Sequence, residues 1–80
     1  MNAAELGAWL AARRALLIRE PSPPGMHYVM IFCIDDPQNQ VRACSEDLER
    51  AISVAQFAYD LTPEKRIELV MSTTGGIGKC

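Results

Sequence analysis

The residues that come closest to a chemical motif lie in the stretch "STTGGIGKC" at the C-terminal end. A phosphate-binding P-loop has a glycine, four residues, Gly-Lys and then Ser or Thr, because its backbone N–H groups and its lysine surround phosphate oxygens. Gly78 and Lys79 fit this pattern. Thr73, however, stands where the first glycine belongs, and Cys80 replaces the hydroxyl residue that would bind Mg²⁺. The sequence therefore predicts that residues 75–80 form a flexible, exposed, glycine-rich tail rather than a phosphate-binding loop.

The same tail resembles two known groups of proteins. "GGIGK" is similar to the deviant phosphate loop of partition-type ATPases, and this resemblance implies nucleotide binding at Lys79. Two strands, a helix and a further strand before Gly75-Gly76 resemble the β-grasp of ubiquitin-like modifiers and sulfur carriers. This second resemblance covers residues 27–76 at the level of topology. It implies a carrier whose Gly76 becomes terminal once "IGKC" is removed.

Metal binding and catalysis both need several side chains that converge on one point. His27 and Cys33 are six residues apart on one predicted strand, so about 20 Å separates them. Cys33 and Cys44 could meet across a hairpin, but two ligands do not make a structural zinc site. Asp35 and Asp36 are adjacent carboxylates, but aspartate is common in turns for its hydrogen bonds to the backbone, so the pair does not indicate catalysis. We therefore expect no catalytic residue, no metal and no cofactor, and a protein that is not an enzyme.

The charge of the chain limits the kinds of partner that it can bind, and its cysteine content indicates the cellular compartment. The 80 residues have a net charge of −2, with three basic and two acidic side chains in residues 1–20 and five basic and eight acidic ones in residues 21–80. An acidic body argues against direct nucleic-acid binding. Three cysteines without paired spacing are typical of reduced thiols, which predicts a cytoplasmic protein. We expect neither a secretory signal nor a membrane span, since Arg13-Arg14 interrupts the first apolar stretch.

The elements that would position any binding residues begin with residues 1–20, whose pattern predicts an amphipathic helix. Asn2 can cap it, with Glu5 three residues later. Arg13 falls in the middle of the apolar face, and Pro21 prevents much continuation. That face is formed by Leu6, Trp9, Leu10, Leu16 and Leu17.

The next segment predicts a linker and a hairpin. "PSPPG", residues 21–25, is typical of a stiff, extended linker. Residues 27–34 alternate but are apolar on both sides, which predicts a strand in a sheet that is covered on both faces. A turn with Pro37 at its second position and a short strand over residues 41–45 complete the hairpin.

A second helix is predicted over residues 45–61, with Ser45 as its N-cap. Its apolar side would face the sheet, and its polar side, including Gln56, would face water. Residues 66–72 fit a strand or a helix; we favour a strand, because a two-stranded hairpin is marginal in water. The sequence thus predicts a small α+β domain in the order α-β-β-α-β, with a short, three-stranded, largely antiparallel sheet packed against helices. Its parts are a helix (1–20), a linker (21–25), an α+β core (26–74) and a tail (75–80).

Binding to another protein is the function that remains. Trp9 and Arg13 combine the two residue types most enriched at interface hot spots, and the Ala-rich back of their helix allows close approach. We therefore predict contacts to a partner by the first helix, including a homodimer through it. Small size, acidity and the missing catalytic motif are similar to phage-encoded inhibitors of bacterial defence, anti-CRISPR proteins included. An acidic body would fit a partner that itself binds nucleic acid. The predicted partner-binding residues are Trp9, Arg13, Arg14, Glu49 and Asp60.

Overall fold

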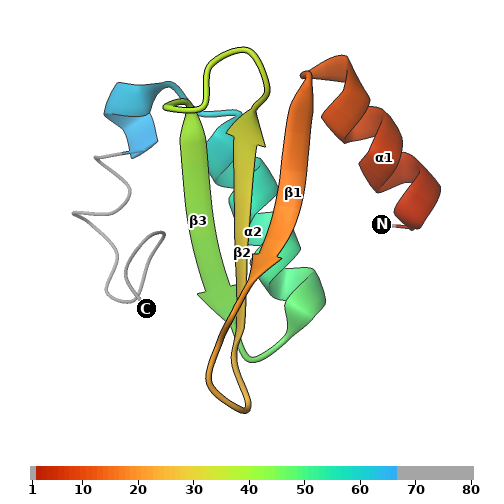
Figure 1. Cartoon of the computed structure of the whole chain (residues 1–80), viewed down its shortest axis with the longest axis vertical. Coiled ribbons are helices and arrows are strands. Elements are labelled where there is room, and N and C mark those ends of the chain that lie inside the picture. The colour runs from red at the N-terminus through yellow and green to blue at the C-terminus, as the bar shows by residue number, and fades with distance from the viewer. Residues whose placement is uncertain (1, 67–80) are drawn as a thin grey trace.

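The computed structural model describes residues 2–66, which form one sheet with helices around it (Figure 1). The elements in chain order are α1 (Ala3–Ala12), β1 (Ala15–Glu20), β2 (His27–Cys33), β3 (Gln40–Ser45) and α2 (Leu48–Tyr59), followed by a helical turn at residues 63–66. The three strands are antiparallel in the order β1-β2-β3. α2 crosses one face of the sheet, and α1 extends sideways from the start of β1 (Figure 1).

α1 begins where the sequence predicts and ends earlier. The side chain of Asn2 accepts a hydrogen bond from the backbone N–H of Glu5 at 2.8 Å, so the predicted cap is confirmed. At the other end, the N–H groups of Arg13 and Arg14 donate to the carbonyls of Leu10 and Ala11, both at 3.1 Å. Arg14 has a φ of 49°, the left-handed conformation that commonly terminates a helix.

The prediction of one helix over residues 1–20 is therefore wrong beyond α1. Residues 15–20 form β1 and pair with β2 over six positions. Helix propensities differ by only a few tenths of a kcal/mol between most residue types, and tertiary contacts override them. A strand here gives the β2–β3 hairpin the third strand that it needs for a stable sheet.

The proline-rich segment connects two neighbouring strands of this sheet. Residues 21–26 link β1 to β2, and the Ser22 hydroxyl donates to the carbonyl of Met26 at 2.8 Å. Gly25 adopts a φ of 85°, which residues with a Cβ rarely reach. The segment predicted as a linker is thus the connection of a hairpin, and β1 belongs to the same sheet as β2.

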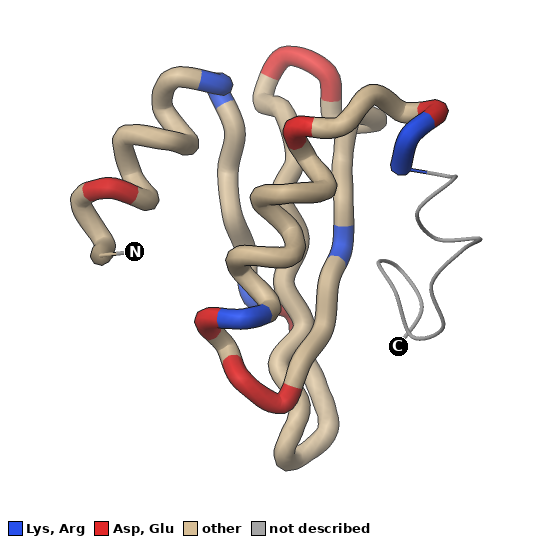
Figure 2. The backbone as a smooth tube through the Cα atoms, turned by 180° about the vertical axis from the view of Figure 1, so that it is seen from behind, with Lys and Arg blue, Asp and Glu red and all other residues tan. Residues whose placement is uncertain are grey.

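The β2–β3 turn is confirmed, and the start of α2 is shifted. Asn39 N–H donates to the carbonyl of Asp36 at 2.8 Å, which places Pro37 at the second position of the turn. Asp47, and not the predicted Ser45, caps α2 by accepting from the N–H of Glu49 at 3.1 Å. Ser45 instead accepts from the N–H of Asp47. Apart from Arg42 within β3, most charged residues lie in loops and near the ends of elements (Figure 2).

The core lies between α2 and one face of the sheet. Small residues on α2, of which Ala51, Ala55 and Ala58 are fully buried, bring the helix close to the strands. Gln56, predicted to face water, is 8% exposed and belongs to this buried side. The sheet contributes Ala15, Val29, Ile31, Val41 and Ala43.

The fold class is confirmed: a small α+β domain with a three-stranded antiparallel sheet packed against helices. The third strand of the described sheet is β1. The strand predicted over residues 66–72 lies outside the described residues apart from Arg66, which ends the helical turn.

Candidate protein-binding surface

The face of the sheet opposite α2 carries large apolar side chains that are open to solvent. Leu16 lies opposite Phe32 and Ile18 lies opposite Met30 in the β1–β2 register. Because side chains alternate along a strand, these residues point away from the buried Val29 and Ile31. Leu16 is 47% exposed, Ile18 40% and Ile34 46%. We call Leu16, Ile18 and Ile34, with the half-buried Met30 and Phe32 between them, the open face.

The open face corrects one prediction. A strand that is apolar on both sides is expected in a sheet covered on both faces. Among residues 2–66, α2 covers one face, and α1 lies beside β1 rather than across the other face (Figure 1). α1 has no buried residue. A contiguous exposed apolar patch of this kind is typical of an interaction site.

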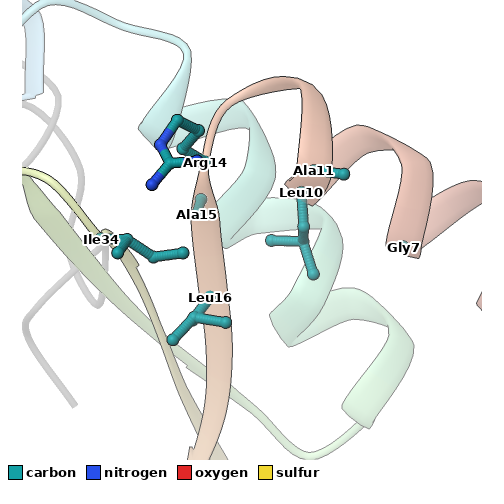
Figure 3. A pocket seen from close by; sticks show the side chains of 7 residues that line it. All are labelled: Gly7, Leu10, Ala11, Arg14, Ala15, Leu16 and Ile34. Atoms are coloured by element: carbon teal, nitrogen blue, oxygen red, sulfur yellow. The ribbon is translucent and has the colours of Figure 1, made fainter.

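A groove continues the open face toward α1. It has a volume of about 450 Å³ and lies between α1 and β1, with the Leu10 side chain pointing into the space between them (Figure 3). A Cβ added at Gly7 would meet no atom within 4 Å, so α1 leaves room on this side. The residues around the groove are Gly7, Leu10, Ala11, Arg14, Ala15, Leu16 and Ile34. Apolar side chains with one charged group at the rim are a common lining for a binding site.

The charged group at the rim is held by an ion pair. Arg14 donates through Nε to one Asp35 carboxylate oxygen at 2.6 Å and through a terminal nitrogen to the other at 3.3 Å. This hydrogen bond and the charge of Arg14 lower the pKa of Asp35. Both side chains are well exposed, so the pair fixes the position of Arg14 and contributes little stability.

α1 is attached to the domain by an aromatic and ionic cluster at the end of α2. Trp9 meets Tyr59 edge to face, with the ring centres 5.8 Å apart. The Arg13 guanidinium lies 4.0 Å from the centre of the Trp9 ring and forms an ion pair with Asp60 at 2.8 Å. Arg13 also donates to the Trp9 carbonyl at 3.0 Å. We call Trp9, Arg13, Tyr59 and Asp60 the helix clamp.

Arg66 also contacts Tyr59 and the C-terminal end of α2. Its guanidinium donates to the carbonyls of Ala58 and Tyr59 at 3.0 and 2.7 Å and to the Asn39 side chain at 2.6 Å. It lies 5.3 Å from the centre of the Tyr59 ring. These contacts satisfy two carbonyls at the C-terminus of α2 and join it to the β2–β3 turn.

The five predicted partner-binding residues do not form one surface. Trp9, Arg13 and Asp60 come together in the helix clamp, so each has a partner within the chain. Arg14 lies at the groove and pairs with Asp35. Glu49 is exposed at the opposite end of α2. Whether any of them contacts another protein stays a prediction.

Sequence reasoning missed Leu16, Ile18 and Ile34 as candidate site residues. The first two were assigned to a helix, where Leu16 would share a face with Trp9. Their signal was the apolar run "ALLI" directly before a polar end, which fits a strand as well as a helix. Only the pairing with β2 decides between these alternatives.

Tyr59 is a buried titratable side chain with Cys33 beside it. Burial raises the pKa of its phenol, and the neighbouring Cys33 adds to this effect. Cys33 is a free thiol.

The structure also bears on metal binding and on membrane crossing. No three His, Cys, Asp or Glu side chains within residues 2–66 are placed to share a metal ion. In that same part of the chain, every helix is too short or too polar to cross a bilayer. The predicted phosphate loop, the Gly75-Gly76 pair and the tail over residues 75–80 lie outside the described residues.

No protein family, curated protein or solved structure matches this chain. The proposed function therefore rests on the geometry of the open face, the groove and the helix clamp.

Proposed function

We propose that this protein acts by binding another protein through the open face and the adjoining groove, and that it catalyses no reaction. The observation that supports this is the exposure of Leu16, Ile18 and Ile34 by 40–47% on one contiguous side of the sheet. Burying a large aliphatic side chain is worth about 1.5–3 kcal/mol relative to exposing it. A partner that covers the open face gains from several such side chains at once.

The chemistry of the surface favours a partner segment with apolar side chains. The groove is lined by aliphatic residues, and its charged residue, Arg14, is already neutralised by Asp35. Apolar contact is therefore the main source of affinity, with polar contacts at the rim. An inhibitor or regulator, including one of the anti-CRISPR type, is consistent with this mode of action.

The alternative hypothesis is that an acidic surface of this protein binds the basic groove of a nucleic-acid-binding partner. The structure offers less support for this hypothesis. Asp60 is paired with Arg13, and the two acidic residues predicted to bind, Glu49 and Asp60, lie at opposite ends of α2. Binding dominated by charge would weaken steeply with salt, because screening acts over about 8 Å at physiological ionic strength. Binding by the open face would change little, so the salt dependence of affinity separates the two modes.

The test compares two lysine substitutions in capture from the source cell. Ile18→Lys places a charge on the open face, and we expect it to lose the protein that wild type retains. Phe57→Lys is the matched control, because Phe57 is 60% exposed on α2, away from the open face. Both variants should keep the circular dichroism spectrum of the wild type. Equal retention by Ile18→Lys and wild type would contradict the proposal.

A cytoplasmic location is part of the proposal. The free thiol of Cys33 is compatible with a reducing compartment. Fractionation of the source cell, followed by thiol labelling of Cys33 with and without reductant, tests this location.

A further inference from the structure

The proline-rich loop between β1 and β2 lies outside the surface used by the proposed function. It consists of residues 21–26 and projects beyond the end of the sheet (Figure 1, Figure 2). All five residues of "PSPPG", from Pro21 to Gly25, are exposed. A hairpin can be closed by about two residues, so the connection of β1 to β2 does not by itself require three exposed prolines.

Residues 21–24 form a short polyproline II segment. Proline fixes φ at about −65°, and a residue that precedes proline is confined to extended or polyproline II conformations, which applies to Ser22 and Pro23. The N–H of Met26 donates to the carbonyl of Pro23 at 3.2 Å, and Gly25 has a φ of 85°. These two features define a type II turn with Pro24 at its second position, where φ and ψ are about −60° and 120°. The polyproline II conformation thus continues through Pro24 and ends at Gly25.

The loop is held in this conformation at both ends. β1 ends at Glu20 and β2 begins at His27, and the two strands are paired next to it. The hydroxyl of Ser22 donates to the carbonyl of Met26 at 2.8 Å, which ties the two arms of the loop together. A segment that is already ordered loses less conformational entropy when it binds. A polyproline II backbone also forms no internal hydrogen bonds, so a partner can donate to its carbonyl groups.

We propose that this loop binds a groove lined with aromatic side chains on another protein, and that Pro21 and Pro24 enter the groove. A polyproline II helix has three residues per turn, so these two prolines lie on the same side of the segment. Prolines at this P-x-x-P spacing dock into aromatic-lined grooves, because the segment presents its rings in a conformation that is already formed.

A positive charge beside the loop adds to the chemistry of the partner. Arg19 is exposed and lies two residues before Pro21. A terminal nitrogen of Arg19 lies 3.4 Å from Nδ1 of His27. Among residues 2–66, Arg13, Arg14 and Arg42 form ion pairs, whereas Arg19 forms none. The charge of Arg19 therefore favours a carboxylate at the rim of the partner's groove.

The loop and the groove of the proposed function lie at opposite ends of β1. The groove reaches Ala15 and Leu16 at the start of this strand, and the loop follows Glu20 at its end. A partner in the groove thus leaves the loop accessible. The inference does not depend on the proposed function, and its test needs only purified proteins.

The first experiment measures binding of the full chain to a panel of purified SH3, WW and EVH1 domains, whose grooves are lined with aromatic side chains. We expect at least one domain to bind. Pro21→Ala should raise its dissociation constant at least about tenfold, because the ring and the fixed φ are both lost. Pro37→Ala is the matched control, since Pro37 is an exposed proline in the β2–β3 turn, and it should bind like wild type. Both variants should keep the circular dichroism spectrum of the wild type.

Binding by no domain of the panel would overturn the inference. Equal dissociation constants for wild type and Pro21→Ala would overturn it too, as would equal weakening by Pro21→Ala and Pro37→Ala.

The second experiment locates the site on the wild-type chain and needs no substitution in the loop. When the domain that binds is added to protein labelled with ¹⁵N, the amide signals of Arg19, Ser22 and Gly25 should shift in the NMR spectrum. Those of Gly7 and Ala11, which line the groove at the other end of β1, should not shift. Arg19→Ala should weaken binding more at low salt than at high salt, because exposed charges are screened. Shifts confined to the groove would contradict the proposal.

Discussion

Arg13 and Asp60 are 47 positions apart in the chain, and their side chains form a two-pronged ion pair with N–O distances of 2.8 and 3.2 Å. The pair joins the end of α1 to the end of α2. It also orients the Arg13 guanidinium over the ring of Trp9, which itself packs against Tyr59. Arg13, which lies in the middle of the predicted apolar face, thus attaches α1 to α2, although α1 has no buried residue of its own.

Loss of the helix clamp should loosen α1. Arg13→Ala removes an exposed ion pair worth about 0.2–1 kcal/mol and a cation–π contact worth about 0.5–1 kcal/mol. We expect the free energy of unfolding in urea to fall by about 1 kcal/mol. The fluorescence of Trp9, the single tryptophan of the chain, should shift to longer wavelength as its ring becomes more exposed. Arg50→Ala, on the exposed side of α2, is the control and should change neither quantity.

Arg14 should be replaced by glycine with less loss of stability than by alanine. Its φ of 49° costs about 1 kcal/mol for a residue with a Cβ, and glycine avoids this cost. Both substitutions remove the exposed ion pair with Asp35. We therefore expect Arg14→Gly to be about 1 kcal/mol more stable than Arg14→Ala in urea unfolding. This order is the reverse of the one in a helix interior, and finding alanine more stable would contradict the left-handed conformation.

Arg66 should not be replaceable by lysine. Its guanidinium spans three acceptors on α2 and the β2–β3 turn, and a single ammonium group cannot match this planar arrangement. Each lost hydrogen bond costs about 0.5–1.5 kcal/mol, so Arg66→Lys should lower the midpoint of thermal unfolding measurably. Arg50→Lys, at an exposed position of α2, serves as the control. Equal midpoints for wild type and Arg66→Lys would show that these contacts contribute nothing.

Tyr59 should ionise at higher pH in the folded protein than in the unfolded chain. Burial, and next the charge and hydrogen bond of Cys33, raise its pKa above the ordinary value. A raised pKa means that its contribution to stability is complete below about pH 10 and is lost as the pH rises through the folded pKa. In a titration of tyrosine absorbance, Tyr59→Phe should remove a step that lies above the ordinary pKa of tyrosine. Cys33→Ala should lower the pKa of Tyr59 only in part, because burial is the larger cause of the raised pKa.

The local features of this protein could be predicted from its amino-acid sequence alone. Asn2 as an N-cap and Pro37 in its turn depend on neighbours within a few positions, and both lie where the sequence predicts. The apolar strand predicted over residues 27–34 is likewise local, and it is observed as His27–Cys33. The α+β class follows from the same local signals. Capping, turn formation and alternation act over short distances along the chain, so a sequence pattern is sufficient to read them.

The secondary structure of residues 15–20, and with it the position of the candidate site, depends on packing between distant segments. "ALLIRE" fits a helix or a strand, and only the six-position pairing with β2 makes it β1. That pairing places Leu16 and Ile18 on the open face. The partners of Arg13 and Arg14, at Asp60 and Asp35, are likewise fixed by packing. Contacts between residues far apart in the chain depend on how the elements pack together, and no local pattern encodes them.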